Sequence, residues 1–179
     1  MQLTEEILKR ITPNCPQVKR REIVSILNDI CEDYAINNER RLSAFIATLA
    51  VESAEFRYQE EIASGSAYEG RGDLGNTVAG DGRRFKGRGR IQITGRFNYK
   101  AYTEYLRRSK HLPFIDFVQH PEKLAQEPYA TDSAAWFFAV KIGANQLADK
   151  RQCLNIQGRV NGRNRKTGLP NHWTERKKY

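Results

Sequence analysis

Long apolar runs are missing from this 179-residue sequence. The longest apolar stretches, at about 45–51 and 134–140, fall far short of the roughly 20 residues that a membrane-spanning helix needs. The N-terminus also lacks a basic stretch followed by an apolar run and a small-residue cleavage site, so we expect no secretory signal. We therefore expect a protein that has no membrane anchor and is made in a cytoplasm.

Cysteine and histidine are scarce, with three residues of each type. The cysteines, Cys15, Cys31 and Cys153, form an odd and scattered set, which argues against a disulfide framework and is typical of a reducing compartment. No histidine stands at a zinc-site spacing from a cysteine or from another histidine. We therefore expect free thiols, no metal and no cofactor.

The remaining composition is that of an ordinary globular protein. Hydrophobic residues make up 39% of the chain and charged residues 28%, which are values typical of folded domains and not of disordered or fibrous chains. The length is sufficient for one domain that buries most of its apolar surface without disulfides. We expect a single domain, and nothing in the sequence requires more than a monomer.

Positive charge is concentrated at the C-terminus. The formal net charge is +9, and residues 151–179 contain eight Lys or Arg against the single acidic residue Glu175. Such a tail raises the affinity for polyanions, which include nucleic acids, lipid headgroups, lipopolysaccharide and wall polymers that bear carboxylates. Charge alone does not choose among these partners.

Apolar residues at three- and four-residue spacing predict a mainly α-helical chain. Thr4 followed by two glutamates predicts a helix start, and Pro13 and Pro16 must end that helix. The same reasoning predicts the further helices at about 18–34, 39–56, 99–106, 128–142 and 148–160.

Glycine is concentrated in residues 65–95, which hold nine of the thirteen glycines of the chain. Interleaved apolar residues indicate packing, so we expect an ordered functional loop instead of a disordered one. Within it, residues 90–94 alternate polar and β-branched side chains, which predicts a short strand. Gln92 and Thr94 would lie on one side of that strand and face a cleft.

Glu52 is the most informative acidic residue. It stands three residues after Leu49 and seven after Phe45, so it continues the apolar stripe of the predicted helix. Burial disfavours the charged form of a carboxyl group, as a general acid working near neutral pH requires. The alternative interpretation is a helix-end glutamate in contact with water.

A second carboxylate near Glu52 would allow hydrolysis of a glycosidic bond. That reaction usually needs one acid to protonate the leaving oxygen and one carboxylate to activate water or to act on the sugar. Glu55, Glu60 and Glu61 all follow Glu52 within nine positions. The residues alone leave the choice among them open.

The order of these features resembles glycoside hydrolase family 19, and the phage endolysins of that family match best. The likeness is carried by residues 45–53, 60–76 and 80–94, and it continues through 98–99, 134–138 and 160–162. It therefore covers most of residues 40–162. The resemblance implies a mainly α, lysozyme-like α+β fold with a small β-hairpin region beside the active-site cleft. It also implies that residues 1–179 form a single catalytic domain without a separate wall-binding domain.

The resemblance assigns roles to individual residues. It implies that Glu52 is the general acid, that Glu61 is the general base, and that Thr94 holds the attacking water. The sugar-contacting positions of the family correspond to Gln92, Asn98 and Asn161. Family members invert the anomeric centre, which requires the two carboxyls to stand about 6.5–9.5 Å apart.

The chain departs from the family pattern at four positions. The family commonly has His before the acid and Gly-Gly shortly after it, where this chain has Val51, Ala54 and Glu55. A second glycine often seen after Asn161 and Gly162 is replaced by Arg163. Glu60 competes with Glu61 for the role of base, and the nine-residue spacing from the acid favours Glu61.

The context of the chain favours peptidoglycan over chitin as substrate. Peptidoglycan carries peptides with free carboxylates and suits a protein of net charge +9, whereas chitin is neutral. We therefore expect a phage endolysin that cuts the β-1,4 backbone of peptidoglycan by an inverting acid/base mechanism. The resemblance implies that such a protein is made in the bacterial host cytoplasm and reaches the periplasm and wall through a separate membrane-permeabilising protein.

Several alternatives stay open beside this hypothesis. The chain could be a chitinase, or a lytic transglycosylase that releases anhydro sugars. A nucleic-acid-binding module is the rival from another class, but most aromatic residues have helical core spacing, so we expect no nucleic-acid partner. The basic C-terminus, with Trp173, could bind lipopolysaccharide of an anionic outer membrane, or it could be a solvated tail.

Overall fold

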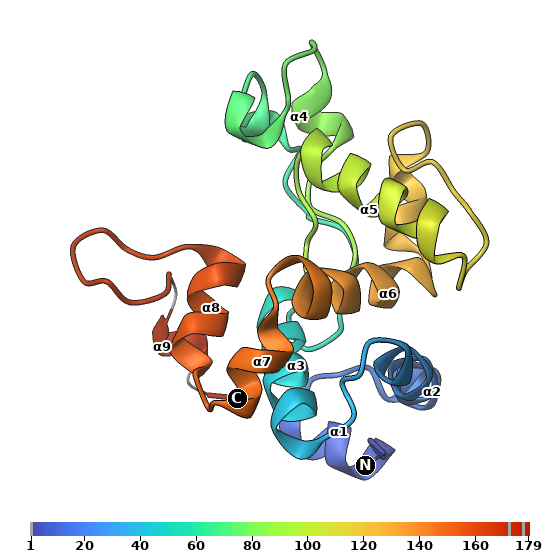
Figure 1. Ribbon diagram of the computed structural model, residues 1–179, viewed down its shortest axis with the longest axis vertical. Coiled ribbons are helices and arrows are strands. Elements are labelled where there is room, and N and C mark those ends of the chain that lie inside the picture. Colours follow the sequence, from blue (N-terminus) through green and yellow to red (C-terminus); the bar gives the residue numbers. More distant parts are fainter. Residues whose placement is uncertain (1, 172, 177) are drawn as a thin grey trace. The chain divides into compact units, whose positions relative to one another are not determined.

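The computed structural model describes residues 2–171, 173–176 and 178–179 (Figure 1). The chain is mainly helical, which confirms the predicted fold class. Within these residues, no helix combines the length and apolar character that crossing a bilayer requires. The chain divides into two compact units: unit 1 extends to Arg57 and resumes at Ala135, and unit 2 contains Tyr58 to Ala134. The single catalytic domain stays a prediction.

Unit 1 begins with two helices at the predicted places. Helix α1 (Glu5–Ile11) is capped by Thr4, whose hydroxyl accepts a hydrogen bond from the backbone N–H of Ile7 at 3.2 Å. Helix α2 (Gln17–Asp33) starts directly after Pro16, a residue that cannot continue the preceding helix. The predictions for both helices are confirmed.

Helix α3 (Glu39–Glu52) is the central element of the predicted site. Asn38 caps it, and Phe45 and Leu49 are fully buried on its apolar face. The helix ends at Glu52, four residues earlier than predicted. The reason is the backbone of residues 54–56, which have φ angles of 49°, 60° and 64° in the left-handed region and cannot continue a right-handed helix.

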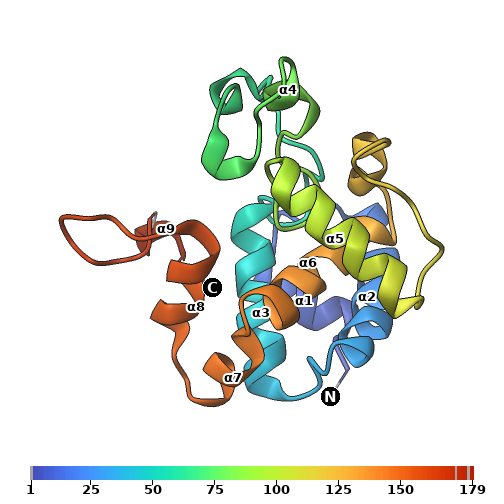
Figure 2. The same ribbon diagram turned by 45° about the horizontal axis from the view of Figure 1, so that its top comes forward.

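The second half of unit 1 is a series of short helices: η4, a π-helix (Trp136–Lys141), α7 (Ala144–Asp149), α8 (Cys153–Asn161) and α9 (Trp173–Arg176). The helix predicted for 148–160 is confirmed from Cys153 onward, but its predicted start is wrong, because Arg151 adopts φ 56° and separates α7 from α8. The helix ends predicted at about 142 and 160 are confirmed, and the glycines that follow them, Gly143 and Gly162, both have positive φ. Helices α7, α8 and α9 all contact α3 (Figures 1 and 2).

Unit 2 contains the glycine-rich segment and the helices that support it. Its elements are η1 (Ser66–Tyr68), η2 (Gly72–Leu74), α4 (Asp81–Arg84), α5 (Arg96–Ser109), η3 (Pro121–Ala125) and α6 (Tyr129–Ala135), whose last residue already belongs to unit 1. Buried aromatic rings form its core: Phe85 packs against Tyr99 at 5.2 Å between ring centroids, and Tyr102 stacks on Phe117 at 5.2 Å.

The glycine-rich segment is held by a polar network, as expected for an ordered loop. The Glu69 carboxylate accepts hydrogen bonds from the backbone N–H groups of Gly80 and Gly82. The buried Asp81 pairs with the Arg96 guanidinium, and this pairing lowers the pKa of Asp81 below its usual value. The loop of residues 65–95 is therefore fixed by side chains at both of its ends.

The strand predicted for 90–94 is wrong. Residues 89–92 form turns, and Gln92 adopts φ 58°, which interrupts the extended backbone that alternation requires. Within unit 2, β structure is confined to isolated bridges that pair Arg88 with Glu60 and with Ile93. The expected β-hairpin region thus exists as bridged turns.

Candidate active site

Glu52 is the last residue of α3, and its side chain is only 16% exposed. Its Oε1 atom accepts a hydrogen bond from Nη2 of Arg176, whose side chain is 2% exposed. Glu52 is thus a helix-end residue, as the alternative interpretation had it, but its carboxyl is largely shielded from water and is paired with a buried cation.

Arg176 connects Glu52 to a chain of buried polar groups. Its Nη1 atom donates to Oε1 of Gln157 in α8, and Nε2 of Gln157 donates to the Thr48 hydroxyl of α3 at 3.0 Å. The Nε atom of Arg176 also donates to the carbonyl oxygen of Asn171 at 3.2 Å. The guanidinium is thus fixed from three sides and determines where the Glu52 carboxyl points.

Arg176 is not among the site residues predicted from the sequence. The residue is one of eight cations in the basic tail, and the tail was interpreted through its charge alone. Arg176 and Glu52 are 124 positions apart, so no local spacing could have indicated their contact. Part of the predicted basic tail is therefore buried structure of unit 1.

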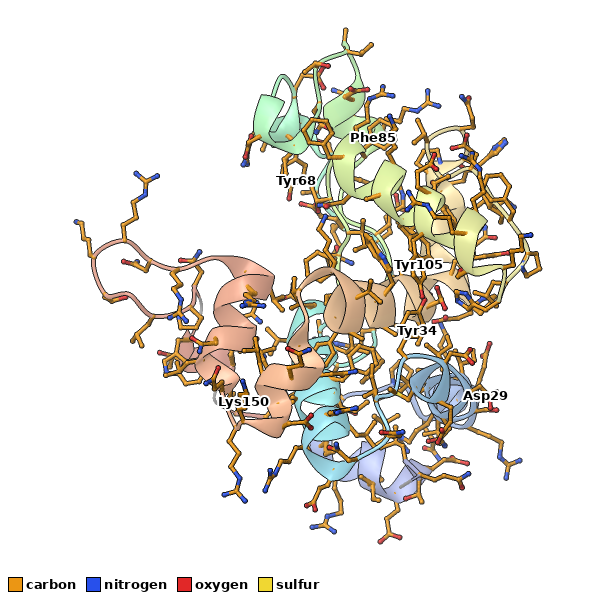
Figure 3. All side chains as sticks on the ribbon, in the orientation of Figure 1. Asp29, Tyr34, Tyr68, Phe85, Tyr105 and Lys150 are labelled. Carbon is orange, nitrogen blue, oxygen red and sulfur yellow. The ribbon has the colours of Figure 1, made fainter. Side chains whose placement is uncertain are left out.

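Glu61 lies in unit 2, where neutral donors hold its carboxylate. The Tyr68 hydroxyl, labelled in Figure 3, donates to Oε1 at 3.0 Å, and the backbone N–H of Gly87 donates to Oε2 at 3.0 Å. Burial, followed by the hydrogen bond to Glu61, raises the pKa of Tyr68. Among the described residues no cation pairs with the Glu61 carboxylate, so this group is fixed in position without being neutralised.

Glu60 has the opposite surroundings. Its Oε1 atom lies 3.1 Å from Nζ of Lys86 and 3.1 Å from Nη2 of Arg88. Desolvation acts to raise the pKa of Glu60, but the hydrogen bonds and charges of Lys86 and Arg88 outweigh it and lower the pKa. The Glu60 carboxylate therefore already forms ion pairs with two cations, which makes it a poor acceptor for a proton from water.

The Glu55 carboxylate is also engaged by other residues. Its carboxylate accepts hydrogen bonds from the backbone N–H of Asn14 at 2.6 Å, from the Asn14 amide at 3.0 Å and from the Tyr179 hydroxyl at 2.8 Å. Desolvation acts to raise the pKa of Glu55, but these hydrogen bonds lower it overall. Glu55 thus connects the segment after α3 to the turn between α1 and α2 and to Tyr179.

Gln92, Thr94 and Asn98 lie together in unit 2. Nδ2 of Asn98 donates to the carbonyl oxygen of Thr94 at 2.7 Å, and the Thr94 hydroxyl donates to the carbonyl oxygen of Gln92 at 2.9 Å. The hydroxyl keeps its acceptor lone pairs for a further partner such as water.

Gly87 links this group to Glu61. A Cβ atom at Gly87 would lie 2.7 Å from Oε1 of Gln92 and 3.2 Å from Oε2 of Glu61. The absence of a side chain at this position therefore lets the amide and the carboxylate lie next to one another.

Asn161 is the last residue of α8 in unit 1. Its carbonyl oxygen accepts a hydrogen bond from the Asn171 side chain at 2.8 Å, and Asn171 in turn accepts from Arg176. The six predicted site residues thus form two groups: Glu52 and Asn161 in unit 1, and Glu61, Gln92, Thr94 and Asn98 in unit 2. In the part of the chain that is described, no three His, Cys, Asp or Glu residues are grouped so that they could hold a metal ion.

Comparison with known proteins finds similar sequences. A glycosyl hydrolase family 19 domain-containing protein of Haemophilus influenzae is 28% identical over 108 residues, which are 60% of this chain and 48% of that protein. An endochitinase of Arabidopsis thaliana is 28% identical over 138 residues, which are 74% of this chain and 45% of that protein. The chain spans less than half the length of these relatives.

The fold has relatives among solved structures. A bacterial family 19 chitinase superposes with a TM-score of 0.72 over 97% of this chain and 88% of that chain, at 15% sequence identity. No family model matches the sequence. In sequence and in fold, the chain is thus similar to the chitinase-like proteins of glycoside hydrolase family 19.

Proposed function

We propose that this protein hydrolyses the β-1,4 glycosidic backbone of bacterial peptidoglycan by an inverting acid/base mechanism. The observation that carries the proposal is the difference between two neighbouring carboxylates. Glu60 is neutralised by Lys86 and Arg88, whereas Glu61 is held by neutral donors beside Gln92. An ionised carboxylate that is fixed in place but not paired with a cation suits the general base of a glycosidase.

In this mechanism Glu52 donates its proton to the oxygen of the leaving sugar. Glu61 removes a proton from the attacking water, and the Thr94 hydroxyl accepts a hydrogen bond from that water and orients it. Water attacks the face of the sugar opposite the leaving group, so the configuration at the anomeric carbon inverts. Gln92, Asn98 and Asn161 are proposed to contact the sugars.

The charge of the protein supports peptidoglycan as the polymer. Both peptidoglycan and chitin contain β-1,4-linked N-acetylated glucosamine units, so the chemistry of bond cleavage does not distinguish them. The net charge of +9 favours the polymer that carries carboxylates. Chitin is the alternative, favoured by the relatives that are described as chitinases.

A role in host cell lysis follows from the same proposal. We propose an endolysin, made in the bacterial cytoplasm, that reaches the periplasm and the wall with the help of a separate membrane-permeabilising protein. The exposed residues Arg165 and Lys166 could add affinity for lipopolysaccharide. Replacing both with Ala should weaken binding to lipopolysaccharide vesicles while leaving turnover of soluble wall fragments unchanged, and unchanged vesicle binding would contradict this role.

The test of the proposed function is digestion of purified peptidoglycan and of chitin hexamer by the same preparation, with mass analysis of the sugar ends. We expect new reducing ends from peptidoglycan and a much slower reaction on chitin. Anhydro sugar ends would identify a lytic transglycosylase, and faster cleavage of chitin would identify a chitinase. A DNA-binding shift without cleavage of either polymer would overturn the assignment as an enzyme.

A further inference from the structure

A pocket of about 660 Å³ opens within unit 1. Glu52 does not line it, but Arg176, which pairs with Glu52, does. Helices α3, α7, α8 and α9 contribute to its lining, together with the turn between α7 and α8, where Figure 3 labels Lys150. The volume falls in the range typical of sites for small molecules. The proposed cleavage chemistry leaves this pocket without a function.

The floor of the pocket carries methyl groups and an aromatic ring. Ala44 and Ala47 line it from α3, Ala148 from α7 and Ile156 from α8, with Trp173 of α9 beside them. Because apolar surface predominates in this floor, a ligand with small apolar side chains would lose little free energy when it moves from water into the pocket.

The rim of the pocket is basic. Arg151 is exposed, and no described residue accepts a hydrogen bond from its guanidinium or forms an ion pair with it. Arg40 uses one donor on the carbonyl oxygen of Asp149 at 2.9 Å. Among the described lining residues Glu39 is the one acid, against Arg40 and Arg151 on the rim and Arg176, which pairs with Glu52. A guanidinium with unused donors is suited to bind a carboxylate in two-point fashion.

The backbone at Arg151 supports a role for its side chain. Arg151 adopts φ 56°, a conformation that favours glycine, and it does so at the turn that ends α7. A non-glycine residue in the left-handed region is uncommon. The position therefore combines an unfavourable backbone conformation with a cation that has no ion-pair partner among the described residues.

We propose that this pocket binds the peptide stem of peptidoglycan, a short peptide with methyl side chains and free carboxylates. The inference rests on the proposed function and names a recognition point for the part of the substrate that chitin lacks. The alanine-lined floor would receive the methyl groups, and Arg151 and Arg40 would bind the carboxylates. Binding a stem in the same unit that carries Glu52 would raise the local concentration of glycan strands at the enzyme.

Cys153 gives a direct probe of the pocket. It is exposed and lines the pocket, whereas Cys15 and Cys31 are buried. Occupation of the pocket should therefore slow the reaction of Cys153 with a thiol reagent. The probe ligand is the tetrapeptide L-Ala-γ-D-Glu-diaminopimelate-D-Ala, and the same peptide with its carboxylates amidated is the chemical control.

We expect the tetrapeptide to protect Cys153 in the parent protein and in Arg165→Ala, a matched variant that removes an exposed arginine outside the pocket. Arg151→Ala should bind roughly 10-fold more weakly, because it removes a charge-assisted hydrogen bond to a carboxylate of the peptide. The amidated peptide should protect poorly. No protection of the parent at millimolar peptide, or equal protection of parent and Arg151→Ala, would overturn the inference.

Wall cleavage is measured separately, so the two proposals fail in different ways. A protein that cuts peptidoglycan but does not bind the tetrapeptide contradicts the stem pocket alone. One that binds the tetrapeptide but cuts no wall contradicts the proposed cleavage function alone. Glu52→Gln should keep Cys153 protection while losing cleavage, because Glu52 does not line the pocket.

Discussion

At the scale of single residues, the surroundings of Glu60 and Glu61 distinguish two carboxylates that are neighbours in sequence. Glu60 contacts Lys86 and Arg88, while Glu61 contacts the Tyr68 hydroxyl and the Gly87 N–H. The two residues are adjacent in the chain. The difference therefore arises from the groups of the glycine-rich segment that contact each carboxylate. This difference can be tested by replacing either glutamate with its uncharged isostere.

Glu61→Gln should lower kcat/KM on wall suspensions by ~10²–10⁴-fold, because it removes the general base while keeping the shape of the side chain. Glu60→Gln is the matched control and should retain activity within about tenfold, since it loses only a half-exposed ion pair. The measurement is initial turbidity loss together with the thermal midpoint of each variant. Equal activity losses in two equally stable variants would contradict the assignment of the base.

Arg176 is proposed as a positioning residue for Glu52, because its guanidinium pairs with the Glu52 carboxyl. Arg176→Ala should lower kcat more than it raises KM, because it removes the contact that orients the Glu52 carboxyl. Arg176→Lys should restore part of kcat, since an ammonium supplies the charge but not the planar fork. If instead only stability falls while kcat of the folded fraction is unchanged, Arg176 has a structural role alone.

At the scale of elements, the end of α3 is set by a left-handed backbone run that contains no glycine. Ala54 has φ 49°, which is a strained value for a residue with a Cβ atom. Ala54→Gly should therefore raise the free energy of unfolding by about 0.5–1 kcal/mol, as relief of this strain outweighs the added chain entropy. Urea unfolding measures the change.

The control for this substitution is Ala47→Gly, which lies inside α3 with helical backbone. It should lower the free energy of unfolding by about 1 kcal/mol, because glycine is a poor helix former. If both substitutions destabilise the protein equally, the left-handed run is not a source of strain.

The ion pair between Arg41 of α3 and Asp149 of α7 predicts a dependence of stability on pH. The hydrogen bond from Arg41 lowers the pKa of Asp149 from 3.8 to about 2. A depressed carboxyl pKa contributes stability that is present above the unfolded value and is lost as pH falls through the folded one. The contribution should therefore be present above pH 3.8 and disappear toward pH 2.

Asp149→Asn tests this dependence. The variant should be less stable than the parent at pH 6, and the difference in thermal midpoint should shrink as pH falls from 4 toward 2. A difference that is constant over this range would show that the charge of Asp149 does not contribute.

Helix prediction succeeded where apolar periodicity was uninterrupted and failed where a non-glycine residue left the helical backbone. The stripes of α2 and α3 are visible in the sequence because packing selects for them. Arg151 and Gln92 adopt positive φ without the glycine that usually marks such a position, so the break between α7 and α8 and the turn at 89–92 gave no local signal.

At the scale of the whole molecule, the sequence motifs name candidate site residues but not the groups that contact them. Glu52, Glu61 and Thr94 are candidates that stay predictions. Their contacts with Arg176, Tyr68 and Gln92 depend on tertiary structure, and the Arg176 contact spans 124 positions. The net charge of +9 gives no indication that one of its cations is buried against the acid.

The most direct test of the account compares wall digestion by the parent protein and by Glu52→Gln, with mass analysis of the sugar ends. The parent should produce reducing ends, and Glu52→Gln should lose ~10²–10⁴-fold in rate while its thermal midpoint and tetrapeptide binding are retained. A folded Glu52→Gln protein that releases reducing ends at the parental rate would contradict the central claim.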